Sequence, residues 1–418
     1  MLRPIAFVLP VLICSASAIA QDTLRVDMHQ ADSLLISRSL DLLAQHYEID
    51  KAEADRVQAK LFNNPDFGSE WSINPSSGSF FDVGPNGEKA FSIDELFRIA
   101  GQRSLAIREA EQRRNMSEAE YAELASTLRL RLHSDLHEQF YTGHALATIS
   151  SQLDLLKGLV DAYGQQYQNG NVSLKEVTRL RASYFDLNDQ RMGLERQLNG
   201  LQEDLHILLN DQRTIISQPV AAEVLLIRTL PMDSIALIAQ AMKNRPQVLA
   251  ANDELAADSL DLKLQRRTTV PDLSLGVAYD QNGGYIPHYY ALTAGFSLPI
   301  FDRNQAQIKR AAATLEEAKA RSGSAALGVR EEVLRSLADL RSLQNQYTAT
   351  SEGFGTQLDQ LSESLVGNYT KSNISLLEFT DLFESYNASI IGVDKLKADL
   401  QNAYDELEFA TGQRLFDR

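Results

Sequence analysis

The sequence is short of several residue types and motifs, and each shortage excludes a class of protein. Its 418 residues include one cysteine, Cys14, so we expect neither a disulfide framework nor a thiolate metal site. The net charge is −16, and this acidic balance argues against nucleic-acid binding, which relies on clustered Lys and Arg. The sequence also lacks the G-x-S-x-G, P-loop and dinucleotide-binding motifs. We therefore expect no enzyme and no cofactor.

Residues 1–20 have the pattern of a secretory signal peptide. Arg3 precedes a short apolar run, and small residues end at Ala20, which predicts cleavage after that residue. A lipid anchor on Cys14 is disfavoured, because Ile13 stands where a small residue is needed. Beyond this segment no stretch approaches the ~20 apolar residues of a membrane-spanning helix. The sequence therefore predicts an exported protein.

A short phrase occurs twice, at 167–177 and 369–379. Tyr, Asn, Ser, Leu and Glu fall on the same offsets in both copies, and the middle of each is rich in turn-forming residues. Helical patterns flank both phrases. Each phrase is therefore expected to form the tip of a long helical hairpin.

The helices that leave the tips carry apolar residues at alternating spacings of three and four, which predicts supercoiled helices packed knobs-into-holes. After the first tip the repeat runs through Val177, Leu180, Tyr184, Leu187, Arg191, Leu194, Leu198, Leu201, Leu205 and Leu208, with Arg191 as the only polar interruption. After the second tip it runs through Phe379, Leu382, Tyr386, Ser389, Val393, Leu396, Leu400, Ala403, Leu407 and Ala410.

Other phrases also recur at nearly the same offset. Pro65-Asp66-Phe67 returns as Pro271-Asp272-Leu273, which predicts two tandem repeats over 21–215 and 216–418. Each repeat is expected to contain a helix, two strands, a long helix, the tip and a return helix. The first helices are expected at about 27–62 and 233–268, the second broken at Asn244-Arg245-Pro246.

Apolar residues alternate with small or polar ones around 66–74, 272–280 and 289–298. This pattern is typical of membrane-barrel strands and equally of a half-buried soluble sheet. The long helices expected at about 95–168 and 302–369, each on the order of 100 Å, favour the barrel. Four strands cannot close a barrel, and lipid tolerates no open edge. Other copies of the chain are therefore expected to complete it.

In their order and duplication, these phrases resemble the TolC family of outer-membrane efflux channels. The resemblance covers essentially the whole mature chain and rests on Pro271-Asp272-Leu273-Ser274-Leu275-Gly276, on the run from Phe296 to Arg303, and on the two tips. It implies an α+β membrane channel. A homotrimeric, 12-stranded outer-membrane β-barrel would continue into a long periplasmic α-helical coiled-coil barrel.

The resemblance also implies a function, a location and partners. The protein would sit in the outer membrane of a Gram-negative bacterium, with most helices in the periplasm. It would passively conduct substrates delivered by an inner-membrane pump, of the RND or a similar type, and a periplasmic membrane-fusion adaptor. Some relatives belong to a heavy-metal efflux branch (CzcC/CusC-like), and metals are the favoured cargo over drugs or other small molecules.

Two sets of site residues follow from the resemblance. Glu378 and Asp381 would form a carboxylate gate at the periplasmic entrance; Glu176 and Arg179 stand at the matching offsets of the first repeat. The alternative is that these acids only stabilise a helix start. Contacts with the adaptor are expected from the tip residues Gly170, Asn171, Ser173, Ser372, Asn373 and Ser375.

Three histidines share one face of the first long helix. The spacing of His133 and His137 could hold a divalent metal, but solvated histidines are favoured, and no metal site is assigned.

A second class of protein remains open, namely a periplasmic coiled-coil adaptor or scaffold without a channel. Such an adaptor usually has one hairpin per chain, whereas this sequence predicts two hairpins together with paired strands.

Overall fold

The computed structural model describes residues 23–73, 89–218, 227–229, 233–283, 286–351, 365, 367–369, 371 and 373–416. The predicted signal peptide therefore lies outside the described residues. The chain divides into two compact units, and each contains segments from both halves of the sequence. These units do not coincide with the tandem repeats expected from the sequence, which stay a prediction.

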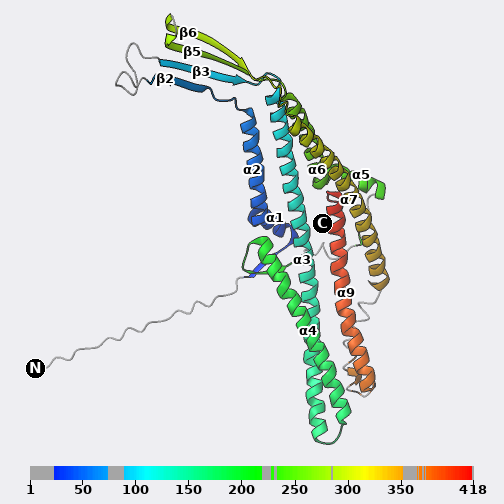
Figure 1. Ribbon diagram of the computed structural model, residues 1–418. Helices are drawn as coiled ribbons and strands as arrows, with labels where there is room; N and C mark the ends of the chain where they lie inside the picture. The colour runs from blue at the N-terminus through cyan, green and yellow to red at the C-terminus, as the bar shows by residue number, and fades with distance from the viewer. Residues whose placement is uncertain are drawn as a thin grey trace, which may run out of the picture. The chain divides into compact units, whose positions relative to one another are not determined.

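The first unit contains the two hairpin tips. One helix ends at the first tip and a second helix begins after it, and a third helix begins after the second tip (Figure 1). Its elements are β1 (Thr23–Val26), most of α1 (Met28–Arg38), α3 (Gln102–Gln168) from Leu132 onward, α4 (Leu174–Leu209), β4 (Thr214–Ser217) and α9 (Leu376–Thr411) as far as Ala398.

The core of the first unit follows the predicted heptad. Along α4 the buried apolar positions are Val177, Leu180, Leu187, Leu194, Leu201, Leu205, Leu208 and Leu209. Several of them share one apolar cluster with Ile149 and Leu156 of α3 and Phe379 of α9. The three-four spacing therefore holds these helices together by burying one continuous stripe.

β1 and β4 form a short parallel pair that the sequence did not predict. Leu24 pairs with Ile215 and Val26 with Ser217. Each strand has four residues, too few for an alternating pattern to stand out from chance.

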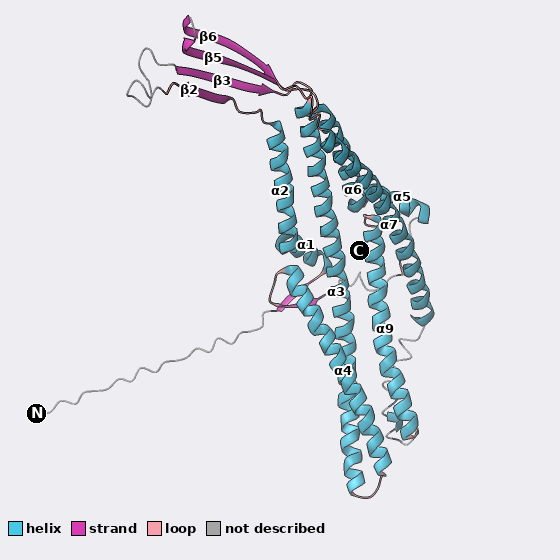
Figure 2. Cartoon of the chain, in the orientation of Figure 1, coloured by secondary structure: helices cyan, strands magenta, loops and turns pink. Residues whose placement is uncertain are grey.

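The second unit contains one four-stranded sheet and helices that lead into and out of it (Figures 1 and 2). Its elements are α2 (Leu40–Lys60), β2 (Asp66–Trp71), β3 (Lys89–Phe97), the start of α3, α5 (Ser234–Asn244), α6 (Pro246–Arg267), β5 (Leu273–Gly283), β6 (Ile286–Phe296), α7 (Gln305–Ser351) and the end of α9. The strand order is β2-β3-β5-β6, and every pairing is antiparallel.

The start of the first long helix differs from the expected boundary near residue 95. β3 continues to Phe97, which pairs with Leu273, and α3 begins only at Gln102. No proline interrupts this segment, so its backbone N–H groups can continue the ladder. Gly101 then turns the chain with a φ of 75°, a conformation that glycine adopts without strain.

The predicted break between α5 and α6 is confirmed. α5 ends at Asn244, and Pro246 is the first residue of α6, where its missing N–H costs nothing. Between them, Arg245 is 2 % exposed and its guanidinium lies 3.6 Å from the centroid of Phe409. It forms ion pairs with Glu123 at 3.1 Å and Glu332 at 3.2 Å. The break is therefore anchored by a buried, paired charge.

Among the described residues, no helix combines the length and the apolar content that a membrane span requires.

Candidate functional site

The first hairpin tip is a short turn closed by side chains. Gly170 has a φ of 76°, and the backbone N–H of Asn171 donates to the carbonyl of Gln166 at 2.9 Å. Ser173 is the N-cap of α4, and its hydroxyl accepts from the backbone N–H of Glu176 while the Glu176 carboxylate accepts from the backbone N–H of Ser173. These reciprocal bonds form a capping box.

The second tip repeats this geometry. The Ser375 hydroxyl accepts from the backbone N–H of Glu378 at 3.2 Å, and the Glu378 carboxylate accepts from the backbone N–H of Ser375 at 2.8 Å. The backbone N–H of Asn373 donates to the carbonyl of Asn368 at 2.9 Å. Ser372 lies outside the described residues. Ser173 and Ser375, expected as contact residues, therefore also start the two return helices.

The two proposed gate carboxylates lie one helical turn apart at the start of α9. Bonds from the Ser375 backbone N–H and hydroxyl lower the pKa of Glu378. Asp381 accepts a hydrogen bond from Arg179 Nη2 at 3.2 Å, and the side chains of Arg179 and Asp381 are 40 % and 64 % exposed. Arg179 also donates through Nε to Thr380 Oγ1 at 2.9 Å. The structure therefore gives each carboxylate a partner within the chain.

Aromatic rings pack beside the second tip. Tyr369 Oη donates to Tyr163 Oη at 2.5 Å, and the Tyr369 ring stacks on Phe379 with 4.6 Å between centroids. Burial, followed by the bond to Tyr163, raises the pKa of Tyr369. The sequence repeat aligns Tyr369 with Tyr167. The hydrogen bond between Tyr369 and Tyr163 could therefore not be predicted from the repeat.

We expected solvated histidines on α3, but not all of them are exposed to solvent. His133 is buried, and its Nε2 lies 2.9 Å from Asp32 Oδ1 in α1. His137 lies beside it, with 6.5 Å between ring centroids. His144 is exposed and bonds through Nδ1 to the buried Asp394 at 2.6 Å. His133 and His144 therefore tie α3 to α1 and to α9.

One face of the four-stranded sheet is apolar and open to solvent. Across the strands, Phe67 pairs with Ile93, Ile93 with Val277, and Val277 with Leu292. All four side chains are at least half exposed, and Leu292 is 89 % exposed. A soluble sheet would bury such a row.

The opposite face of the sheet is small and polar. Gly68, Ser92, Ala278 and Ala291 form the adjacent cross-strand row. Thr293 Oγ1 donates to Asp94 Oδ1 at 2.9 Å. A Cβ at Gly276 would meet the backbone carbonyl of Ile93 at 2.6 Å, so a larger residue would displace the neighbouring strand. The sheet thus separates an apolar side from a polar side.

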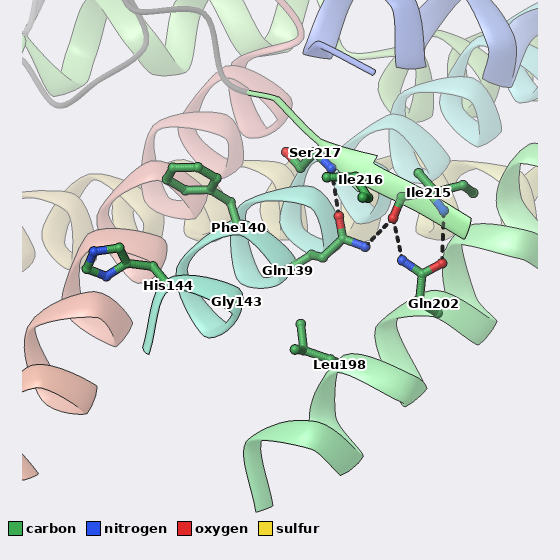
Figure 3. Close-up of a pocket in the computed structure, with 9 residues that line it drawn as sticks. All are labelled: Gln139, Phe140, Gly143, His144, Leu198, Gln202, Ile215, Ile216 and Ser217. Carbon is green, nitrogen blue, oxygen red and sulfur yellow. Dashed lines mark hydrogen bonds between the residues drawn. The ribbon is translucent and has the colours of Figure 1, made fainter. Parts of the chain in front are cut away.

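A cavity of about 530 Å³ lies in the first unit between α3, α4 and β4 (Figure 3). Its lining residues are Gln139, Phe140, Gly143, His144, Leu198, Gln202, Ile215, Ile216 and Ser217.

Its two glutamines are engaged by the edge of β4. Gln139 donates to the carbonyl of Ile215 at 2.7 Å and accepts from the backbone N–H of Ser217 at 2.8 Å. Gln202 accepts from the backbone N–H of Ile215 at 3.0 Å. These amides close the edge of the strand, so the cavity presents mainly apolar side chains.

Residues 237–362 match the family model described as "Outer membrane efflux protein". Two curated proteins are similar in sequence. The pyoverdine export outer membrane protein OpmQ of Pseudomonas putida is 27 % identical over 36 % of this chain and 32 % of its own length. The cobalt-zinc-cadmium resistance protein CzcC of Cupriavidus metallidurans is 19 % identical over 70 % of this chain and 67 % of its own length. The chain thus aligns with about a third of OpmQ.

The fold matches solved outer-membrane channels over nearly its whole length. The crystal structure of CusC superposes with a TM-score of 0.74 at 17 % identity, covering 92 % of both chains. The Campylobacter jejuni CmeC outer membrane channel gives a TM-score of 0.76 at 14 % identity, covering 93 % of this chain and 87 % of that one.

The fold is therefore that of the TolC-like outer-membrane channels. Part of the chain matches the outer membrane efflux protein family, and the comparisons support a location in the outer membrane of a Gram-negative bacterium. The resemblance read from the sequence is confirmed at this level.

Proposed function

We propose that this protein is the outer-membrane exit channel of a tripartite efflux system. It passively conducts substrates that an inner-membrane pump and a periplasmic membrane-fusion adaptor deliver. The observation that carries the proposal is the four-stranded sheet with one apolar exposed face, one polar face and no further described strand beyond β2 or β6.

Three copies completing one barrel would remove both open edges of this sheet. The apolar row of Phe67, Ile93, Val277 and Leu292 would then contact lipid, and the row of Gly68, Ser92, Ala278 and Ala291 would line a water-filled interior. A barrel of twelve strands, four from each copy, is the closure that we propose. The two tandem repeats would each supply two of these strands.

The alternative, a periplasmic coiled-coil adaptor without a channel, leaves the sheet unexplained. The side chains of Leu292 and Tyr290 are 89 % and 75 % exposed. In an adaptor in the aqueous periplasm, they would therefore be in contact with water. Exposed apolar area of this kind is unfavourable in water. The channel accounts for it by placing these residues in lipid.

The tips are the proposed contacts with the adaptor. Gly170, Asn171, Ser173, Asn373 and Ser375 are all exposed, and their backbones are held by the turn bonds and capping boxes described above. A preorganised surface loses little conformational entropy on binding. Small side chains at these positions would let adaptor helices approach closely.

Glu378 and Asp381 are the proposed gate. In a trimer with the second tips around one axis, they would form two stacked rings of three carboxylates. Because Arg179 bonds to Asp381, the Glu378 ring would keep most of the uncompensated charge. This arrangement would favour cations over anions in the passage.

Heavy-metal cations are the proposed cargo. CzcC, the relative aligned over 70 % of this chain, is named for cobalt-zinc-cadmium resistance. The second candidate is export of a siderophore-type molecule, because OpmQ is named for pyoverdine export and is the more identical of the two over its shorter match. A deletion strain that becomes sensitive to metal salts without losing siderophore secretion would favour the first cargo.

A charge placed on the sheet tests the channel directly. Leu292→Arg puts a cation on the apolar face, which in lipid costs about 2–4 kcal/mol near the membrane midplane. Ala291→Arg puts the same cation on the opposite face and is the matched control. We expect Leu292→Arg to reduce the folded protein in the outer membrane far more than the control; equal effects would refute the lipid-facing assignment.

A further inference from the structure

Positive charge is concentrated where the strands of the four-stranded sheet join their helices. The four joining segments are residues 60–66, 97–108, 263–272 and 302–310, and they meet at one end of the sheet (Figure 1). These junction segments contain ten Lys or Arg residues and three Asp or Glu residues, whereas acids outnumber bases by 56 to 40 in the whole chain. One end of the sheet is therefore basic in an otherwise acidic protein.

The ten Lys and Arg residues of these segments, the junction cations, are open to solvent. Nine of them are exposed, and the tenth, Arg103, is half-buried. Within the described residues none of the ten takes part in an ion pair, whereas farther along the same helices Arg113, Arg114 and Arg321 each pair with an acid. The junction cations are therefore available to anions from outside the chain.

Aromatic rows on the apolar face of the sheet indicate where the junction lies relative to a membrane. At the junction end this face carries the cross-strand row Phe97, Leu273 and Phe296. These residues lie four positions from the apolar row described above, so alternation places them on the same face. Six positions from them, toward the other end, the face carries a second row of Phe91, Tyr279 and Tyr290. Because membrane barrels have aromatic girdles at both lipid–water boundaries, we expect the junction at the level of the lipid headgroups.

The other end of the sheet has charges of both signs. There the charged residues of the described strands are Glu70, Lys89 and Asp280. Because the long helices leave from the junction end, the proposed channel places that end at the periplasmic leaflet of the membrane. The excess of cations therefore lies at one leaflet only.

Two junction arginines are held by backbone carbonyls beside exposed Phe rings. Arg103 Nε donates to the carbonyl of Lys60 at 3.0 Å, its Nη2 donates to the same oxygen, and its guanidinium carbon lies 3.9 Å from the centroid of Phe62. Arg303 Nε donates to the carbonyl three residues before it at 3.3 Å, and Phe301 lies between the two in the chain. The Phe62 and Phe301 side chains are 67 % and 92 % exposed. Since a guanidinium has five N–H donors, each arginine has donors left for an acceptor outside the chain.

We propose that the junction cations bind the phosphate groups of anionic phospholipids in the periplasmic leaflet of the outer membrane. The inference rests on the channel proposed above, because only a sheet that crosses the membrane brings the junction to a leaflet. A guanidinium can bind two phosphate oxygens at once, and basic residues next to a membrane attract anionic headgroups. Phe62 and Phe301 would lie beside these headgroups, at the depth that aromatic side chains prefer.

The surroundings of the junction cations favour a lipid over a free phosphate ion or an anion that passes through the channel. The cations follow directly on the apolar face that is proposed to contact acyl chains, and exposed Phe rings stand among them. A free anion gains nothing from such rings, whereas a phospholipid offers a phosphate and apolar chains together. Binding is therefore expected to require both parts of the lipid.

Lipid titration of the intact protein tests this proposal. Native mass spectrometry of the detergent-purified trimer measures the binding of phosphatidylglycerol, of phosphatidylcholine with the same acyl chains, and of glycerol phosphate without chains. The test variant combines Arg103→Gln, Arg266→Gln, Arg267→Gln and Arg303→Gln. The control variant removes as many charges from exposed positions of α2 and α7 farther from the sheet, and combines Lys51→Gln, Lys319→Gln, Arg321→Gln and Arg330→Gln.

The parent should prefer phosphatidylglycerol over phosphatidylcholine and over glycerol phosphate. The test variant should bind phosphatidylglycerol at least tenfold more weakly, because each lost charge next to the headgroups contributes roughly fivefold. The control variant should bind this lipid as the parent does.

The other outcomes overturn the lipid site, and they separate it from the proposed function. Equal lipid affinity in the parent and the test variant, equal losses in the test and control variants, or tight binding of glycerol phosphate alone would overturn the site and leave the channel intact. Unchanged lipid binding with altered anion selectivity in planar bilayers would place the cations in the passage instead. Monomers in the parent would overturn the proposed function and the lipid site with it.

A smaller variant decides the question if the test variant does not assemble. Arg266→Gln with Arg267→Gln changes two exposed side chains at the end of α6 and leaves the bonds of Arg103 and Arg303 in place. This pair should weaken phosphatidylglycerol binding several-fold. Unchanged binding in its trimers would overturn the lipid site.

Discussion

The two hairpin tips share one backbone design but differ in the residues directly behind it. Both use Ser and Glu in a capping box, at Ser173 with Glu176 and at Ser375 with Glu378. At the next matching offset the first tip has Arg179 and the second has Asp381, and these two residues bond to each other. The two tips thus begin their helices in the same way. The residues that differ between them, Arg179 and Asp381, form a bond between α4 and α9.

The apolar residue behind each cap differs as well. Val177 in the first tip corresponds to Phe379 in the second, and both are buried. Only Phe379 stacks on aromatic neighbours, with centroids 4.6 Å from Tyr369 and 5.5 Å from Phe383. The second tip should therefore depend more on this single side chain.

Core truncation should show the largest difference between the tips. We expect Phe379→Ala to lower the free energy of unfolding by about 3–5 kcal/mol, because it removes a fully buried ring and leaves a cavity. Val177→Ala removes two methyl groups and should cost about 2 kcal/mol. Denaturant unfolding followed by the helical circular dichroism signal measures both; equal losses would contradict the role given to the aromatic stack.

Removing the caps should affect both tips alike. Ser173→Ala and Ser375→Ala each delete a hydroxyl that accepts a backbone N–H bond, and each should cost ~1 kcal/mol. The measurement is the same unfolding experiment. The control is Ser389→Ala, because Ser389 lies in the middle of α9 and does not cap a helix. A cost confined to one tip would show that the two capping boxes are not equivalent.

Loss of Arg179 should change stability little and ion selectivity more. Arg179→Gln removes the bond to Asp381, and such exposed ion pairs contribute about 0.2–1 kcal/mol. In the proposed channel it would add uncompensated negative charge at the entrance. We expect higher cation selectivity in planar bilayers, whereas Glu378→Gln with Asp381→Asn should lower it. Unchanged selectivity in both variants would remove these residues from the gate.

The smallest expected effect is on pH dependence. Bonds from Ser173 and Ser375 lower the pKa of Glu176 and Glu378 from 4.5. A carboxylate with a lower pKa in the folded state stabilises the fold above its unfolded pKa, and this contribution is lost as pH falls through the folded value. When the pH is lowered below 4.5, the melting temperature should therefore decrease less in the double variant Glu176→Gln with Glu378→Gln than in the parent. Identical profiles would contradict the assignment.

The sequence predicted the elements that have long periodic patterns. The strands around Phe67, Val277 and Leu292 and the break at Pro246 are all present, because alternation and proline act locally. The resemblance to one family also placed the fold correctly.

Contacts between distant segments could not be read from the sequence. The buried His133 bonds to Asp32, about a hundred residues away, and Arg179 bonds to Asp381 from a different hairpin. The extension of β3 to Phe97 depends on its ladder with β5. None of these partners shares a local spacing with the residue it contacts, so pattern analysis had no signal for them.

The most direct test of the channel is the mass of the native protein extracted from outer membranes in mild detergent. We expect a complex with three times the mass of the mature chain, which dissociates to monomers on heating. A monomer of the same fold, or recovery of the protein in the soluble periplasmic fraction, would contradict the claim that other copies of the chain complete the sheet.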